Sequence, residues 1–536
     1  MRNKLVLICI FFLAFFLRFY QLGSNPPSLD WDEAALGYNA YSILKSARDE
    51  YGSFLPLSIR SFNDYKPPLY TYLTTIPVYL FDLNEFSTRF VSAFLGTLTV
   101  IVSFFLIRQL IPKESNFFYL LFTFIFAISP WHIQFSRVAF ETNTALFFMI
   151  LGIYFFFRGM KSGNNYLYSM LSFGLSLYSY HSPRLIVPIL IFGLLVLNRK
   201  KLKYQLRWVI LSLSIFALLC LPLVKEFRGT TSARFGSVTI LNNNEILGSS
   251  LKELEFDNLQ NDYLGKLLHN RRIIYAKEIL GAYLNHFNLD FLFLTGDAAS
   301  RHHASGMGML YWWDAIFLLT GIVVIIRKNY KGKSAIFYWF AIAPIASAIT
   351  KATPHAVRSL FYLPTYQIFI ALGFLYIFRW MKTSLGKKGF NLGLILLLLL
   401  VINFYYYLHM YFIHTPLEES KDWQYGYKQL VEKISTRSDF SKAIITYQYD
   451  QPYIYFLFYQ KIDPVWYQKH WGSGEVQRAN REFGNYFFRG IDWSKDSQLQ
   501  NVILAGTPKE IPKSASGIID EIRFLDGSTA FYIVKQ

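Results

Sequence analysis

Apolar runs of the length that crosses a lipid bilayer recur along this 536-residue chain as far as residue 412. A spanning helix needs about 20 apolar residues, and the shorter runs reach that length if their ends extend into the flanking polar segments. Eleven runs qualify, at about 4–22, 86–107, 116–131, 142–157, 166–181, 185–197, 208–224, 310–326, 334–350, 359–378 and 390–412. The sequence therefore predicts a polytopic α-helical membrane protein with about 11 transmembrane helices.

The composition favours the same class. Hydrophobic residues make up 53% of the chain and charged residues only 16%, whereas soluble proteins carry about 25% charged residues. So few charges cannot cover a protein of this size in water, which excludes a cytosolic enzyme and a disordered chain. Cys9 and Cys220 both lie inside apolar runs, which excludes a disulfide scaffold.

Basic residues are concentrated in the short segments between the apolar runs. With the N-terminus in the cytoplasm, the cytoplasmic segments hold nineteen lysines and arginines against one acid, Glu114. The positive-inside rule describes this asymmetry. The net charge of +18 therefore reports topology and not a nucleic-acid partner.

The predicted topology divides the chain into two domains. Residues 1–414 form a transmembrane domain of the plasma membrane, with long outer loops at 23–85 and 226–309. We expect the second loop to fold back onto the membrane as a partial lid. Because the number of spans is odd, residues 415–536 lie outside the cytoplasm.

The C-terminal residues have the pattern of a small α/β domain. Strands are predicted at Lys442–Tyr447 and Asn501–Ala505, and the aromatic segment Asp450–Tyr459 is either a helix or a strand. Ile518–Val534 reads as a hairpin around Asp526-Gly527, a strong two-residue turn signal. The sequence therefore predicts an extracytoplasmic C-terminal α/β domain.

The first outer loop carries a dense acidic cluster. Asp30, Asp32 and Glu33 lie within four residues, and such carboxylates repel one another unless a cation or a catalytic task justifies the cluster. As an alternative, Asp30 caps a helix that starts near Leu29, and the other two are favourable first-turn charges. The pattern leaves both interpretations open.

A lysine follows later in the same loop. Lys66 precedes Pro67-Pro68-Leu69 on a stiffened turn, although a lysine at a membrane edge commonly serves only to place its charge among the head groups. Few ionisable residues lie inside the predicted spans, which disfavours an ion-coupled transporter. The charges gather instead where a lipid head group would sit.

Together these motifs resemble a known class of enzymes. The Asp32-Glu33 pair after the first span and the Lys66-Pro67-Pro68-Leu69 turn are similar to those of the GT-C polyprenyl-phosphate-sugar glycosyltransferases, in particular the protein O-mannosyltransferases and the lipid A aminoarabinose transferase. The resemblance is most specific over residues 26–110. It implies transfer of a sugar from a polyprenyl-phosphate donor to an extracytoplasmic protein, lipid or glycan acceptor, with inversion of the anomeric carbon.

The resemblance also implies roles for individual residues. Asp32 would orient or deprotonate the acceptor, with Glu33 beside it, and Lys66 would hold the lipid phosphate. Glu141 matches a second acidic position of the class, with capping of the following helix as its alternative role. Further candidates for substrate binding are Tyr38, Arg301, His355 and Arg358.

A zinc site follows from the same resemblance. The aminoarabinose transferase binds zinc through a carboxylate near its Lys-Pro-Pro-Leu turn and a His-His pair in a later outer loop. Asp64, His302 and His303 are the matching residues, although Tyr65 separates Asp64 from Lys66. Carboxylate and imidazole suit zinc, while polar contacts within the loop are the alternative for the histidines.

Two other functions stay open at this point. A transporter or flippase of lipid-linked glycans would share the membrane architecture but needs no outward carboxylate base. A non-catalytic sensor would depend on residues 415–536 and not on Asp32. Substitution of Asp32 therefore distinguishes the enzyme from both.

Overall fold

The structure is a computed structural model that describes residues 2–62, 64–226, 236, 238–242, 244–471 and 481–536. Contacts between residues divide the chain into two compact units. The first unit comprises Met1–Leu13, Leu98–His132 and Ala145–Phe404, and the second comprises Ala14–Thr97, Ile133–Thr144 and Tyr405–Gln536. The predicted boundary at residue 415 stays a prediction, because each unit combines segments that are distant in sequence.

The chain is mainly helical up to residue 435. The helices are α1 (Arg2–Phe19), α2 (Trp31–Ser46), α3 (Leu69–Phe81), α4 (Glu85–Leu110), α5 (Asn116–Ala127), α6 (Pro130–Arg137), α7 (Glu141–Gly159), α8 (Asn165–Leu177), α9 (Pro183–Leu202), α10 (Leu206–Glu226), α12 (Asn244–Leu259), α13 (Tyr263–Leu268), α14 (Arg271–Asn285), α15 (Asp314–Arg327), α16 (Lys333–Ile342), α17 (Ile345–Ala348), α18 (Thr365–His409), α19 (Thr415–Glu418), α20 (Tyr427–Ser435), α21 (Pro452–Tyr459), α22 (Pro464–His470) and α23 (Trp493–Asp496). The strands are β1 (Ile59–Ser61), β2 (Asp64–Lys66), β3 (Lys442–Ile445), β4 (Arg481–Phe483), β5 (Tyr486–Phe488), β6 (Val502–Gly506), β7 (Ile518–Arg523) and β8 (Thr529–Lys535).

Within the described part of the chain, four helical stretches are long and apolar enough to cross a membrane, and a fifth passes if the bent pair α5 and α6 counts as one span. Two of the four are composite: one joins α9 and α10, and the other contains α18, which breaks at Gly386 with φ +53°. Helices α5, α8, α15 and α16 have only 10 to 14 residues. The predicted class of helical membrane protein is confirmed, whereas the count of eleven spans is not.

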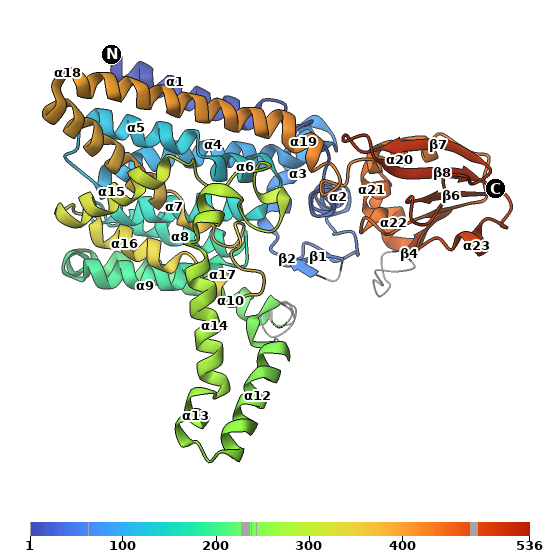
Figure 1. Cartoon of the computed structure of the whole chain (residues 1–536), viewed down its shortest axis with the longest axis horizontal. Helices are drawn as coiled ribbons and strands as arrows, with labels where there is room; N and C mark the ends of the chain where they lie inside the picture. The colour runs from blue at the N-terminus through green and yellow to red at the C-terminus, as the bar shows by residue number, and fades with distance from the viewer. Residues whose placement is uncertain (1, 63, 227–235, 237, 243, 472–480) are drawn as a thin grey trace. The chain divides into compact units, whose positions relative to one another are not determined.

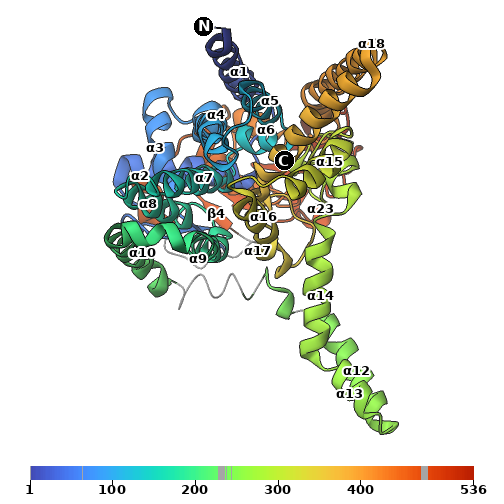
Figure 2. The same cartoon turned by 90° about the vertical axis from the view of Figure 1, so that its left-hand side faces the viewer.

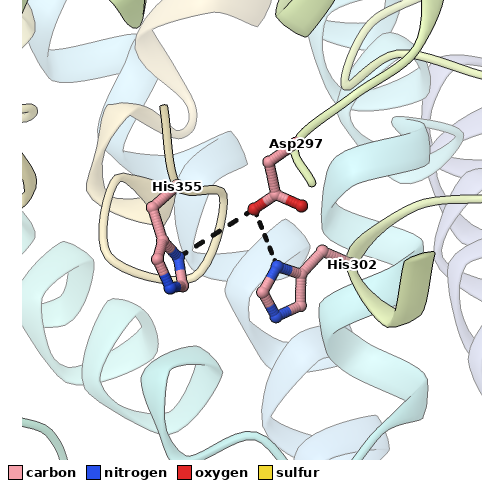
Figure 3. Close-up of side chains that lie close together, drawn as sticks. All are labelled: Asp297, His302 and His355. Carbon is pink, nitrogen blue, oxygen red and sulfur yellow. Dashed lines mark hydrogen bonds and ion pairs between the residues drawn. The ribbon is translucent and has the colours of Figure 1, made fainter. Parts of the chain in front are cut away.

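Close helix packing in the first unit depends on glycine. A Cβ atom at Gly321 of α15 would lie 1.7 Å from the main-chain oxygen of Phe369, and one at Gly373 of α18 would lie 1.9 Å from that of Phe317. The two backbones approach each other as small residues allow in membrane helices; the two helices are neighbours in Figure 2. In the same unit, the loops around the single turn η5 (Ser300–His302) bring Asp297, His302 and His355 together (Figure 3).

The second unit contains a mixed sheet (Figure 1). Among the residues that the structure describes, six strands pair in the order β4-β5-β3-β6-β8-β7, with β5, β3 and β6 parallel and the outer pairs antiparallel. The strands predicted at 442–447, 501–505 and 518–534 are confirmed as β3, β6 and the β7–β8 hairpin. The aromatic segment 450–459 contains the helix α21.

Alternate residues of the central strands enter two different cores. Ala443 and Ile445 of β3 pack in one core with α20, α21 and α22, whereas Ile444 faces the other side. Ala34 and Tyr38 of α2 belong to the first of these cores. The helix that carries the predicted carboxylates is therefore fixed by apolar packing against the C-terminal residues of its own unit.

Candidate active site

The helix that carries the predicted carboxylates begins at a capping box. Asp30 is the N-cap of α2, and its Oδ1 accepts a hydrogen bond of 2.8 Å from the backbone N–H of Glu33. The Glu33 carboxylate accepts in return from the backbone N–H of Asp30 at 3.4 Å. This reciprocal pair satisfies two N–H groups that a helix start leaves free. Asp30 therefore has the capping role that the sequence offered as one alternative.

Asp32, in the first turn of α2, keeps its carboxylate partly exposed. Its side chain is 39% exposed, whereas Asp30 and Glu33 are buried. Lys66 Nζ lies 2.6 Å from Asp32 Oδ1, and the N-terminal end of the helix also stabilises negative charge there. Of the three clustered carboxylates, Asp32 is thus the one that a ligand can reach, and the predicted lysine lies against it.

Lys66 is positioned by the short hairpin of β1 and β2, in which it pairs with Ile59. Its side chain is only 9% exposed. Burial alone would lower the pKa of Lys66, but the nearby carboxylates of Asp32 and Glu141 reverse the shift, so that the pKa lies above its ordinary value. The ammonium group therefore stays charged. Glu141, the predicted second acidic residue, is buried at the start of α7.

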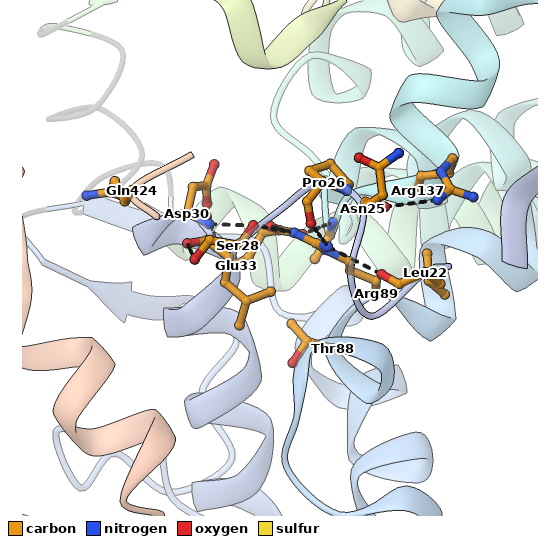
Figure 4. Close-up of polar contacts among 12 residues, drawn as sticks. Leu22, Asn25, Pro26, Ser28, Asp30, Glu33, Thr88, Arg89, Arg137 and Gln424 are labelled. Atoms are coloured by element: carbon orange, nitrogen blue, oxygen red, sulfur yellow. Dashed lines mark hydrogen bonds and ion pairs between the residues drawn. The ribbon is translucent and has the colours of Figure 1, made fainter. Parts of the chain in front are cut away.

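Glu33 forms a fully buried ion pair with Arg89 of α4 (Figure 4). Arg89 Nε donates to Glu33 Oε1 at 2.9 Å, and Nη2 donates to Oε2 at 2.8 Å. The other donor contacts of Arg89 go to the main-chain oxygens of Leu22, Pro26 and Ser28. Both oxygens of Glu33 are buried against Arg89, and the pair joins α2 to α4. The catalytic role of Glu33 stays a prediction.

A second buried arginine, Arg137 of α6, organises the same region. Its Nη1 donates to the main-chain oxygen of Leu17 and its Nη2 to that of Asn25, both at 2.9 Å. Sequence reasoning missed both arginines. Arg89 lies near the start of the second predicted span, and a charge inside an apolar run is the signal that could have found it, because such a charge needs a buried partner.

Gln424 reaches the start of α2 from the C-terminal residues (Figure 4). Its Oε1 accepts from the backbone N–H of Trp31 at 2.8 Å and from the hydroxyl of Tyr455 at 2.6 Å. Its amide nitrogen donates to the main-chain oxygens of Tyr449 and Asp450. Gln424 thereby holds the residue directly before the exposed carboxylate, and no sequence motif marks it in advance.

A further buried carboxylate supports α2. The backbone N–H of Glu50 donates to Asn39 Oδ1 at 2.9 Å, and Glu50 Oε1 accepts from the hydroxyl of Tyr453 at 3.1 Å. Glu50 Oε2 has no hydrogen-bond partner in the described ranges of the chain. Burial raises the pKa of Glu50 to about 7, against the opposing charge of Arg481. The folded protein therefore holds this proton up to neutral pH.

The raised pKa of Glu50 predicts how stability depends on pH. Between pH 4.5, the ordinary pKa, and about pH 7, the folded state binds more protons than the unfolded state, so the free energy of unfolding falls as pH rises through this window. The total loss is about 3 kcal/mol, at about 1.4 kcal/mol for each pKa unit. Glu50→Gln should remove most of it, as measured by denaturant unfolding at both ends of the window. The control is Asp526→Asn, at an exposed position, which should keep the pH profile of the parent protein in this window. If Glu50→Gln also keeps the pH profile of the parent protein, Glu50 is not the group responsible.

The first unit contains a separate cluster of possible metal ligands (Figure 3). Asp297 Oδ2 lies 2.7 Å from His302 Nδ1 and 3.9 Å from His355 Nδ1. One ligand atom from each residue lies within 4.8 Å of the other two. The Nδ1 atom of His355 is buried and has no hydrogen-bond partner among the residues that the structure describes. A buried imidazole nitrogen without a partner, beside a carboxylate, fits a metal ligand.

The charges of the cluster suit the same role. Burial would raise the pKa of Asp297, but His302 and the backbone N–H of Ala356 lower it to about 2. Burial lowers the pKa of His355 well below its ordinary value, and the nearby charge of Arg358 adds to this shift. An ionised carboxylate and a neutral imidazole are the forms that bind metal ions.

The predicted zinc ligands differ from this cluster in two members. His303 follows η5 as an extended residue, and its ring nitrogens face main-chain oxygens of its own loop. Asp64 lies at the start of β2, in the other compact unit. Of the predicted set, His302 is the member that belongs to the cluster, and Asp297 and His355 complete it.

The remaining predicted residues have varied surroundings. Tyr38 is buried in α2, and its hydroxyl donates to the main-chain oxygen of Ile462 at 3.1 Å. Arg301 lies half-buried in η5. Arg358 Nη1 donates to the hydroxyl of Thr350 at 2.7 Å. None of these contacts involves Asp32 or Lys66.

Arg358 also borders a large cavity of the first unit. The cavity measures about 510 Å³, and a second arginine, Arg184, also lines it. Most of its wall is apolar and comes from helices α9, α10 and α17, with Leu185, Pro188, Leu223, Val224, Ala346 and Ile349 among the lining residues. Such a cavity can take a long apolar chain that ends in an anion.

Solved structures with a similar fold are membrane glycosyltransferases of the GT-C class. ArnT from Cupriavidus metallidurans, solved bound to undecaprenyl phosphate, aligns with a TM-score of 0.55 over 98% of this chain and 97% of its own, at 12% identity. The apo oligosaccharyltransferase of Archaeoglobus fulgidus aligns with a TM-score of 0.50 over 86% of this chain, at 13% identity. This chain spans 64% of the length of that archaeal enzyme. The chain therefore has the fold of this class.

The sequence itself matches one family of the class. Residues 8–229 match the family model of the dolichyl-phosphate-mannose-protein mannosyltransferases. This confirms the resemblance that was predicted from the acidic pair and the lysine turn of the first loop. Among curated proteins, none matches the sequence.

Proposed function

We propose that this protein is a membrane glycosyltransferase that takes a sugar from a polyprenyl-phosphate donor and transfers it to an extracytoplasmic acceptor. One observation carries the proposal: the partly exposed Asp32 carboxylate lies 2.6 Å from the Lys66 ammonium group. Such a transfer needs a base for the acceptor and a cation for the departing phosphate. The family match over residues 8–229 supports the same class of donor.

In the proposed reaction, Asp32 accepts the proton of the acceptor hydroxyl while the hydroxyl oxygen bonds to the anomeric carbon. The bond from that carbon to the phosphate oxygen breaks, and its electron pair leaves with the polyprenyl phosphate. Lys66 stabilises the negative charge that the phosphate gains. A single displacement of this kind inverts the anomeric carbon, and it does not need the two opposed carboxyl groups of a glycosidase.

We propose that the apolar cavity bordered by Arg184 and Arg358 receives the polyprenyl chain. Its wall offers apolar surface to the isoprene units. ArnT, whose fold is similar, was solved with undecaprenyl phosphate bound.

The test is a transfer assay with the purified protein and a panel of polyprenyl-phosphate sugars that differ in the sugar. We expect release of polyprenyl phosphate with one class of donor, and only when an acceptor hydroxyl is present. Suppose instead that no donor is consumed, but a fluorescent lipid-linked glycan crosses the bilayer of proteoliposomes. The protein is then a flippase, and the enzyme assignment is wrong.

We further propose that Asp297, His302 and His355 bind a divalent metal ion, with zinc as the best match to one carboxylate and two imidazoles. An Archaeoglobus fulgidus oligosaccharyltransferase structure with zinc and sulfate aligns with this chain at a TM-score of 0.51. When bound, the ion would supply positive charge that holds together the loops carrying these three side chains.

His355→Ala should lower the zinc content of the purified protein by about tenfold or more, because a site of three protein ligands loses one of them. The content is measured by mass spectrometry of the metal after purification in buffer with a trace of zinc. His470→Ala, on the exposed side of α22, is the matched control and should keep the content of the parent protein. Parent protein that carries no more zinc than His355→Ala would refute the site.

A further inference from the structure

We propose that helices α12, α13 and α14 form an arm that lies in the outer lipid interface and binds anionic phospholipid head groups. The arm, residues 244–285, extends from the rest of its unit in both views (Figures 1 and 2). Helix α14 runs across the direction of α9, which is part of the stretch Pro183–Glu226 that is apolar enough to span. A helix in this orientation lies parallel to the plane of a membrane that α9 crosses.

The end of the arm is held together by polar groups on its inside. Asp257 Oδ2 lies 2.6 Å from His269 Nδ1, and the hydroxyl of Ser250 donates to the main-chain oxygen of His269 at 2.9 Å. A Cβ atom at Gly265 would lie 2.5 Å from Asp257 Oδ1, so α13 packs directly on this carboxylate. Hydrogen bonds therefore join α12 to the loop after α13.

The exposed surface of the same region includes six large apolar side chains that are between 49% and 81% exposed: Phe256, Leu259, Tyr263, Leu264, Leu267 and Leu268. Exposed polar and charged residues lie between them, namely Lys252, Glu253, Glu255, Asn258, Gln260, Asn261 and Asp262. In water this arrangement would leave a large apolar patch uncovered. In the interface of a bilayer, the leucines enter the acyl region and tyrosine lies at the level of the head groups. Exposed apolar side chains interleaved with charged and polar ones are thus explained by the interface of a bilayer as the surrounding medium.

Basic residues at the end of the arm identify the kind of lipid. The cations at this end are Lys266, Arg271 and Arg272, against the single acid Asp262 between residues 259 and 273, in an arm that carries six acids and five bases overall. The two arginines line a cavity of about 370 Å³ together with apolar residues of α12, namely Leu247, Leu251 and Leu254. Guanidinium groups beside leucines match a phosphate joined to an acyl chain. A free phosphate ion would also pair with the guanidinium groups, but it has no acyl chain. The experiment must therefore distinguish a phospholipid from a phosphate ion.

The experiment uses the full chain in nanodiscs, with both native cysteines replaced by alanine and one cysteine introduced for a fluorescent bimane label. Leu267→Cys places the label on the apolar side of the arm, and Asp526→Cys, in the exposed turn between β7 and β8, is the aqueous control. Lipids with brominated acyl chains quench from the membrane, and iodide quenches from water. We expect bromolipid quenching at position 267 to exceed that at position 526 by about threefold or more, and iodide quenching to show the reverse order. A label at position 267 that iodide quenches as strongly as the control, without bromolipid quenching, would overturn the proposal.

A second variant tests the head groups. Replacing phosphatidylcholine by phosphatidylglycerol should lower quenching by uncharged acrylamide at position 267 by about twofold in the parent background, and Arg271→Gln with Arg272→Gln should abolish this difference. Both arginines are exposed, so their loss leaves the fold intact. The lipid assignment is wrong if inorganic phosphate alone protects the label and phosphatidylglycerol has no effect. Neither measurement depends on sugar transfer, so failure here leaves the proposed reaction untouched.

Discussion

Asp32→Asn should lower the rate of sugar transfer by about 10²–10⁴-fold, the usual contribution of a general base. Asparagine has nearly the same shape as aspartate, but it cannot accept the proton of the acceptor hydroxyl. It also loses the ion pair with Lys66. The helix should still start normally, because the capping box is formed by Asp30 and Glu33. The rate is measured as turnover at saturating donor.

The control for this variant is Asp82→Asn. Asp82 lies at the end of α3, is 63% exposed and pairs with Lys461, so its charge is solvated and contributes little. We expect transfer by Asp82→Asn to stay within about twofold of the parent protein, because the residue touches no part of the proposed site. If Asp32→Asn retains more than about a tenth of the parent rate, Asp32 is not the base. Unchanged movement of lipid-linked glycans in that variant, without any transfer by the parent protein, would favour the flippase.

Arg89→Leu should lower the free energy of unfolding by about 3–5 kcal/mol, the usual effect of removing one partner of a buried ion pair. Neither Arg89 nor Glu33 is exposed, so water cannot replace the lost hydrogen bonds. The main-chain oxygens of Pro26 and Ser28 also lose their donor. The free energy is measured by titration of a denaturing detergent into folded protein in mild micelles, with tryptophan fluorescence as the signal.

Two further variants make this measurement specific. Replacing both Arg89 and Glu33 by leucine should destabilise less than the sum of the single changes, because no charge is left buried alone. Lys461→Met, which removes one partner of an exposed pair, should leave the unfolding curve where it is. A loss below about 1 kcal/mol in Arg89→Leu, similar to an exposed pair, would show that the pair does not brace α2.

Local sequence patterns predicted the parts of the fold that depend on neighbouring residues. The helix after Asp30 starts where the capping signal stands, and the turn at Asp526-Gly527 joins β7 to β8, with Gly527 at φ +87°. The number of spans was harder to predict, because hydropathy does not reveal where a helix breaks. Gly386 interrupts α18, and α16 has only 10 residues.

The candidate site was also predicted only in part, because local sequence patterns do not show which distant residues come into contact. The pairing of Asp32 with Lys66 agrees with the roles that the family resemblance implies, although the roles themselves stay proposals. Glu33 was expected beside Asp32 in catalysis, but adjacent residues of a helix point in directions about 100° apart. One of them therefore faces Lys66 and the other faces the interior, where Arg89 lies.

The order of residues alone determined that this chain is a helical membrane protein with an acidic first loop, because apolar length, charge asymmetry and helix caps are properties of short segments. The tertiary structure decided which charges meet. Glu33 contacts an arginine from another helix, Gln424 reaches α2 from the C-terminal residues, and His355 joins His302 in place of the adjacent histidine. Such pairings depend on how distant segments pack, and burial then separates the carboxylate that can react from those that hold the fold.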